Sequence, residues 1–151
     1  MFCAVPVLRM TDADTLNVKI AGPEGVQPST IAVTYDLLVS LSFAESDRPA
    51  VQFVARDLFE CMRLLRQHLE AESTILLCNG ARVDAYPSQI ARQMGAARRV
   101  HLTSLGRPTT REDLVDIFGE APADKIGSVE EQDAFHKEWL RSLGWGQEPR
   151  C

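Results

Sequence analysis

The chain has 151 residues, of which 45% are hydrophobic and 25% charged, and this composition excludes a disordered or a membrane protein. A domain of this length buries about 70% of the surface that its unfolded chain exposes, so we expect one globular domain over residues 1–151, with candidate flexible ends at 1–15 and 146–151. No apolar run approaches the roughly 20 residues of a membrane helix, and the N-terminus lacks a basic signal segment. Both observations predict a cytoplasmic protein.

The formal net charge is −5, but it is unevenly distributed. Residues 82–111 carry six arginines and one acid, whereas residues 112–138 carry nine acids and two lysines. The overall acidity makes nucleic-acid binding unlikely, since a phosphate backbone would be repelled by most of the surface. The two charged segments could pair with each other or form separate faces.

Strands are expected in the first third of the chain. Apolar and β-branched clusters alternate there with turn-rich pieces, and they comprise residues 17–20, 31–35, 37–43 and 51–54. In residues 39–43 the apolar side chains alternate with serines, which predicts a half-buried strand with residues 51–54 as its hairpin partner.

The clearest helix begins after Asp57. Asp57 and Glu60 stand at the N-cap and N3 positions of a capping box, and apolar residues then recur at helical spacing. We expect a helix from about Leu58 to Glu72 with a single apolar face.

The middle of the chain is expected to return to strands. Residues 75–78 form a short apolar run, which predicts a strand in the middle of a sheet. Asn79 and Gly80 favour a two-residue hairpin turn, after which residues 82–86 would return as a strand.

Two short helices are expected next. Ser88 would start a helix that stops at Gly95, and a strand would follow near residues 99–104. Thr109 or Thr110 would cap a second helix, whose first turn would hold Asp113 and Asp116 as favourable partners of the helix dipole.

The last helix has the strongest start signal. Ser128 and Glu131 form a capping box, Phe135 and Trp139 lie on one face, and Gly144 is a natural C-cap. Because strands precede helices along the chain, we predict an α+β fold, with a mainly antiparallel sheet and about three helices packed on it.

No catalytic or metal motif is assembled in the sequence. Cys78 beside Asn79 could act as a thiol nucleophile with His101 as its base, but a cysteine that ends an apolar run is more often a buried structural residue. The histidines and cysteines show no metal-ligand spacing, and the glycines form no phosphate-binding loop. We therefore expect no cofactor or metal and lean against an enzyme.

Two groups of charged and polar residues are candidates for binding. The arginines could grip phosphates or carboxylates, although surface charges are more often solvated or paired within the chain. The acids of the last helix could steer a basic partner or simply keep the surface soluble. The candidates are Asn79, Arg82, Tyr86, Ser88, Arg92, Arg98 and Arg99, together with Glu130, Glu131 and Asp133.

Several short motifs resemble a group of small uncharacterised bacterial proteins. They are Leu76-Leu77-Cys78-Asn79-Gly80-Ala81, Tyr86-Pro87-Ser88, Gln93-Met94-Gly95, Leu105-Gly106-Arg107-Pro108 and Asp113-Leu114-Val115-Asp116-Ile117-Phe118, within a likeness that covers residues 56–143. In size and charge the chain is similar to immunity proteins of toxin systems. This similarity of type implies a protein partner and transfers no catalytic residue.

The leading hypothesis is a cytoplasmic bacterial protein-binding module, an immunity-type inhibitor of a toxin or effector. A first alternative is a small-molecule-binding protein or enzyme with a pocket near residues 78–92. A second is a nucleic-acid-binding regulator that uses the arginine-rich segment 82–111. The sequence does not identify the partner or the oligomeric state.

Overall fold

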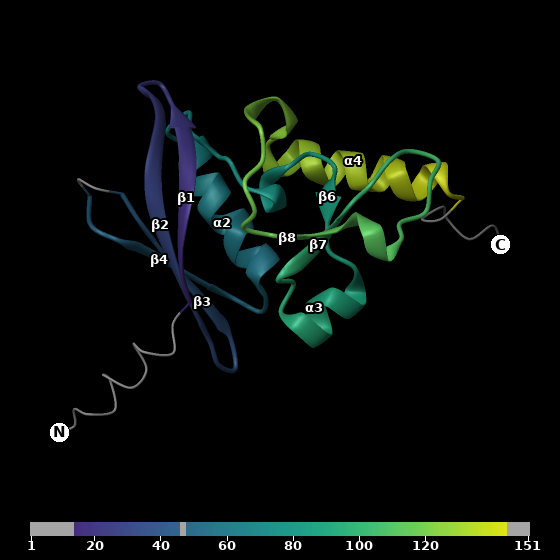
Figure 1. Cartoon of the computed structure of the whole chain (residues 1–151), viewed down its shortest axis with the longest axis horizontal. Helices are drawn as coiled ribbons and strands as arrows, with labels where there is room; N and C mark the ends of the chain where they lie inside the picture. Colours follow the sequence, from purple (N-terminus) through teal and green to yellow (C-terminus); the bar gives the residue numbers. More distant parts are fainter. Residues whose placement is uncertain (1–13, 46–47, 145–151) are drawn as a thin grey trace.

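A five-stranded antiparallel sheet forms one side of the protein in the computed structural model, which describes residues 14–45 and 48–144 (Figure 1). Its strands are β1 (Asp14–Gly22), β2 (Gly25–Tyr35), β3 (Val39–Ala44), β4 (Val51–Ala55) and β5 (Ile75–Leu76), in the order β4-β3-β2-β1-β5. The predicted hairpin is confirmed, because β3 pairs with β4 and its Val39, Leu41 and Phe43 are buried while its serines are not.

Two strand predictions in this sheet are wrong. Leu37 does not open β3, because residues 36–38 form the turn after β2 and the Leu37 side chain is 97% exposed. The run from Ile75 does not lie in the middle of the sheet, since among the described strands the two-residue β5 is at the edge and pairs with β1 alone. Leu76 and Cys78 are nevertheless buried, because packing against other elements covers this edge.

Helix α2 (Leu58–Glu70) lies against the five-stranded sheet, with contacts to β3, β4 and β5. Asp57 caps it as predicted, accepting a hydrogen bond from the backbone N–H of Glu60 at 2.9 Å. The helix is buried over a wider arc than one apolar face, and Phe59 and Arg66 are both enclosed. The reason is that the sheet covers one side of α2 while η1 and α4 contact it as well.

The predicted hairpin turn at Asn79-Gly80 is wrong. These residues begin the 3₁₀ turn η1 (Asn79–Ala81), and Gly80 is not among the glycines with positive φ. Their backbone N–H groups donate to Gly119 and Ile117 rather than to a neighbouring strand. A glycine is required here for space, because a Cβ at Gly80 would overlap the side chains of Ile117 and Met62.

A second, three-stranded antiparallel sheet follows, with β6 (Ala85–Tyr86), β7 (Arg99–Leu102) and β8 (Leu114–Asp116) in the order β6-β7-β8. The predicted return strand is therefore shorter than expected, and its partner is β7 rather than β5. Between them, α3 (Gln89–Gly95) starts where predicted, with the Ser88 hydroxyl accepting from the Ala91 N–H.

The prediction of a helix after Thr110 is wrong, although the predicted cap at Thr110 is confirmed. Thr110 and Asp113 form a capping box around the single 3₁₀ turn η2 (Arg111–Asp113), and the chain then pairs with β7 as β8. Strand pairing thus replaces helix continuation, because Val115 faces Val100 across the ladder. Asp116 consequently lies in a strand and not in the first turn of a helix.

The chain ends with the turn η3 (Ala123–Lys125) and α4 (Val129–Ser142). The capping box of Ser128 and Glu131 is confirmed, and Gly144 has the positive φ of a C-terminal stop. Of the predicted apolar face, Trp139 is buried as expected, whereas Phe135 is only half-buried; the other buried residues of α4 are Val129 and Gln132.

These elements confirm the α+β class, with three α-helices in the described residues. Figure 1 shows the large sheet on one side, the small sheet with α3 and α4 on the other, and α2 between them. No helix among the described residues is long and apolar enough to cross a membrane. Of the predicted flexible ends, residues 14 and 15 belong to β1, and the remainder lies outside the described residues.

Candidate functional site

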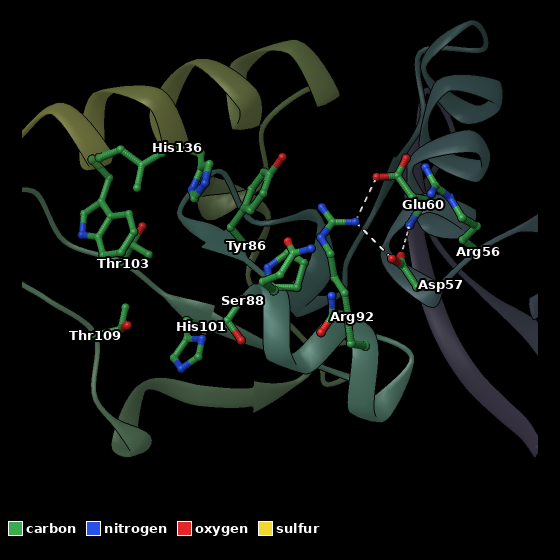
Figure 2. Close-up of a pocket in the computed structure, with 15 residues that line it drawn as sticks. Arg56, Asp57, Glu60, Tyr86, Ser88, Arg92, His101, Thr103, Thr109 and His136 are labelled. Carbon is green, nitrogen blue, oxygen red and sulfur yellow. Dashed lines mark hydrogen bonds and ion pairs between the residues drawn. The ribbon is translucent and has the colours of Figure 1, made fainter. Parts of the chain in front are cut away.

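A pocket of about 860 Å³ opens between the start of α2, α3, the small sheet and α4 (Figure 2). Tyr86 and His101 face each other in the β6–β7 ladder, α3 contributes Arg92, and α4 contributes His136 and Trp139. The pocket therefore draws on elements from most of the second half of the chain, together with the N-cap of α2.

Arg92 ties the two sides of this pocket together. Its guanidinium lies 3.1 Å from the Asp57 carboxylate and 3.2 Å from that of Glu60, as the dashed lines in Figure 2 show. The same group lies over the rings of Phe59 and Tyr86, 5.2 and 5.7 Å from their centroids. Charge pairing and cation–π contact together fix α3 against the start of α2.

An aromatic stack forms the wall below α4. The rings of Tyr86 and His136 are nearly parallel, with centroids 3.6 Å apart, and Trp139 lies 5.8 Å beyond His136. Trp139 is held by its indole N–H, which donates to the carbonyl of Arg107 at 2.9 Å. These contacts fix the orientation of the His136 imidazole before any ligand arrives.

Two histidines that line the pocket, His101 and His136, are shifted toward the neutral form. Burial lowers the pKa of both His101 and His136 below the ordinary histidine value. A neutral imidazole offers one hydrogen-bond donor and one acceptor. The Nδ1 atom of His136 is buried and has no hydrogen-bond partner among the described residues, so the wall contains an unsatisfied polar atom beside the pocket.

Other lining groups also lack side-chain partners in the part of the chain that the structure describes. They are Arg56, Gln89, Gln93, His101 and Thr109. His101 and Thr109 are half-buried, and the others are exposed. The pocket thus combines a wall fixed by internal bonds with donors and acceptors that remain available to a ligand.

The nucleophile considered in the sequence is not available. Cys78 is 1% exposed, lies outside the pocket lining, and burial raises the pKa of its thiol to about 12. The expectation of a buried structural cysteine is confirmed. No group of three or more metal-ligating side chains occurs among the described residues.

Three of the candidate binding residues meet in this pocket, namely Tyr86, Ser88 and Arg92. Asn79 lies elsewhere, and its amide donates to the carbonyl of Asp116. Arg82 is held by Asp84 at 2.8 Å.

The remaining arginine candidates lie outside the pocket lining. Arg98 pairs with Asp116 and Asp14 at 3.2 and 3.4 Å, while Arg99 is exposed and has no ion-pair partner in the described residues. The pairs Arg98–Asp116 and Arg107–Asp113 join the basic segment to the acidic one.

The acids of α4 are mostly committed within the chain. Glu131 completes the capping box through the Ser128 N–H, and Asp133 forms a two-bond pair with Arg63 at 2.6 and 2.9 Å. That pairing lowers the pKa of Asp133. Glu130 alone of the three candidates is exposed without a partner in the described range.

The sequence did not single out His136 or Arg56 as site residues, and it named His101 only as the possible base of a Cys78 nucleophile. Arg56 precedes α2, His101 lies on β7 and His136 on α4, tens of residues apart, so their spacing carries no motif. One signal was available on the last helix, where His136 and Trp139 are three residues apart and therefore neighbours on one face.

Comparison with protein-family models and with curated proteins finds no match for this chain. The fold and the pocket define an α+β protein with a polar and aromatic pocket between α3, α4 and the small sheet, and the resemblance to small bacterial proteins stays a prediction.

Proposed function

We propose that this protein is a ligand-binding protein whose site is the pocket between α3, α4 and the small sheet. The observation that carries the proposal is a cavity of about 860 Å³ that two neutral histidines line beside a fixed aromatic wall. Sites for small ligands have this character, with a preformed cavity, aromatic lining and a few available polar groups.

The ionisation of the lining points to an uncharged, hydrogen-bonding ligand. The lining holds two guanidinium groups, on Arg56 and Arg92, against two carboxylates, on Asp57 and Glu60, so its fixed charges balance, and Arg92 is paired with both carboxylates. Burial lowers the pKa of His101 and His136, so the histidines add no positive charge at pH 7. Amides, hydroxyls and imidazoles can recognise a neutral polar molecule by donating and accepting hydrogen bonds.

Binding is proposed in preference to catalysis because two of the hydroxyls that line the pocket, on Ser88 and Thr103, have structural partners. The Ser88 hydroxyl accepts from the Ala91 N–H, and the Thr103 hydroxyl donates to the carbonyl of Asp84. Neither contact prepares a nucleophile, which requires an adjacent base within hydrogen-bond reach.

A fragment screen followed by amide chemical-shift mapping tests this proposal. We expect neutral polar fragments to shift resonances of α3, β7 and α4 together. The variant His136→Phe keeps a ring beside Tyr86 but removes the nitrogens, and it should weaken such fragments; His68→Phe, on α2 and packed against Phe53, is the matched control. Fragments that bind elsewhere, or no binding at all, would contradict the proposal.

A further inference from the structure

A second hollow of about 490 Å³ lies beside the pocket and shares part of its lining. Arg56, Arg92 and Gln93 line both hollows, so the two are neighbours along one surface. The second hollow is bounded by the end of β2 and by the end of α3, through Tyr35 and Met94. The pocket therefore continues toward the turn between β2 and β3.

Two exposed apolar side chains, Tyr35 and Met94, line this second hollow, and further exposed apolar residues are their neighbours in the chain. Helix α3 has no buried residue, and its Ile90 and Met94, which are four residues apart on one face, are 71% and 83% exposed. Leu37 and Leu38 project from the turn after β2, which Figure 1 places at the same end of the molecule as α3. Grouped exposed apolar residues of this kind mark interaction surfaces.

The charges around the two hollows disfavour a polyanion. Their lining contains three carboxylates, on Asp36, Asp57 and Glu60, against two guanidinium groups, on Arg56 and Arg92. His101 and His136 add no positive charge at pH 7, since burial lowers their pKa. A nucleic acid or an anionic membrane would meet a surface without excess positive charge.

A polar pocket and exposed apolar side chains lie side by side on a surface without excess positive charge. We therefore propose that the ligand is a short linear peptide segment of another protein, with no net charge or a single positive one. This inference rests on the proposed function, because one end of the segment occupies the pocket. The backbone amides of the segment bond to the polar pocket, and an apolar side chain packs beside Tyr35 and Met94. Peptide recognition commonly combines main-chain hydrogen bonds with pockets for individual side chains.

The test is selection from a library of random linear peptides displayed on phage, followed by fluorescence polarisation with the synthesised consensus peptide. We expect a consensus that contains an aliphatic or aromatic residue and no excess of acids. Met94→Asp should weaken the peptide by on the order of tenfold or more, as loss of an interface anchor does, and His136→Phe should weaken it too. Val26→Asp, at an exposed apolar position on the far hairpin, is the control and should leave binding unchanged.

The alternative outcomes separate this inference from the proposed function. Fragment binding in the pocket without any enriched peptide overturns the peptide inference and leaves the ligand-binding proposal standing. A peptide that responds to Met94→Asp but not to His136→Phe overturns the peptide inference, because the segment then does not use the pocket wall, and the fragment screen decides the ligand-binding proposal separately. Binding of an RNA oligonucleotide or of anionic vesicles that Met94→Asp abolishes assigns the surface to another class of partner and overturns the inference.

Discussion

The replacement Gln132→Leu should destabilise this protein more than any change of an exposed glutamine. Gln132 is fully buried on α4, and its amide nitrogen lies 2.9 to 3.0 Å from the carbonyl oxygens of Gly80, Arg82 and Ala85. Its amide oxygen accepts from the guanidinium of Arg66 at 2.7 Å. One side chain therefore joins α2 and α4 to the segment that leads into β6.

The cost follows from the hydrogen bonds that are lost. An amide nitrogen donates two hydrogens, so leucine would remove two bonds to carbonyl oxygens and the acceptor of one guanidinium bond, at about 1–3 kcal/mol each. The carbonyls of Gly80 and Arg82 keep a second donor, the Arg66 guanidinium at 3.5 Å and the Ala85 N–H at 3.2 Å. Arg66 keeps its bond of 2.7 Å to the carbonyl of Gly127. We therefore expect each of the three lost bonds to cost about 1 kcal/mol, which lowers the free energy of unfolding by about 3 kcal/mol in total. Domains of this kind are stable by only about 5–15 kcal/mol.

Urea unfolding followed by circular dichroism measures this loss. With a denaturant slope of about 1–3 kcal/mol per molar, a loss of about 3 kcal/mol should lower the midpoint by roughly 1–3 M. Gln67→Leu, at an exposed position on α2, should shift it little. A loss below about 1 kcal/mol for Gln132→Leu would refute the reasoning.

A double variant separates the bond network from simple packing. Arg66 is buried without a carboxylate within ion-pair distance in the described residues, and burial lowers its pKa to about 10. Arg66→Met combined with Gln132→Leu removes the guanidinium whose acceptor is lost. The double loss should therefore be smaller than the sum of the single losses by about 1–2 kcal/mol, and strict additivity would contradict the network.

Three further predictions concern packing, thiol reactivity and pH. Gly80→Ala should lower the free energy of unfolding by about 1–3 kcal/mol, because the new methyl group overlaps core side chains. Gly95→Ala is the control and should leave it unchanged, because a Cβ there meets nothing within 4 Å. Equal melting temperatures for the two variants would contradict this prediction. Peptide mapping at pH 8 should find Cys78 unlabelled by iodoacetamide in the folded protein, since the pKa of its thiol is about 12; rapid labelling without unfolding would refute its burial. Burial lowers the pKa of His101 and His136 in the folded protein, so the unfolded state binds more protons below about pH 6.5. The free energy of unfolding should therefore fall as the pH drops from 7.5 to 5.5. NMR titration midpoints of these histidines above 6.5 would contradict this.

The starts of helices could be read from the sequence because a cap is a local interaction. Asp57, Ser88 and Ser128 each accept a hydrogen bond from a backbone N–H three residues later, and that geometry needs no distant residue. The same locality explains why Thr110 was identified as a cap while the element after it was not. Whether the chain continues as a helix or pairs with β7 depends on Arg99–Leu102, which no local pattern contains.

The candidate site was harder to predict than the fold for the same physical reason. Tyr86, Ser88 and Arg92 were singled out because they follow one another closely in the chain. His101 and His136 join them only through strand pairing and ring stacking. The arginine-rich segment also suggested binding residues that the pocket does not contain. Arg82 and Arg98 form ion pairs with nearby carboxylates and lie outside the pocket lining.

Asp57 connects the clearest sequence signal to the proposed site. One of its carboxylate oxygens caps α2 and the other accepts from Arg92, so the residue that begins the main helix also holds α3 in place. The wall formed by α2 and Arg92 is therefore set by the fold itself. Helix α3, which has no buried residue, depends on this contact, and a ligand that bonds to Gln89 or Gln93 would add the packing that α3 lacks. Ligand binding should consequently slow hydrogen exchange in α3 more than in α2, because stability gained on binding appears first where local stability is lowest.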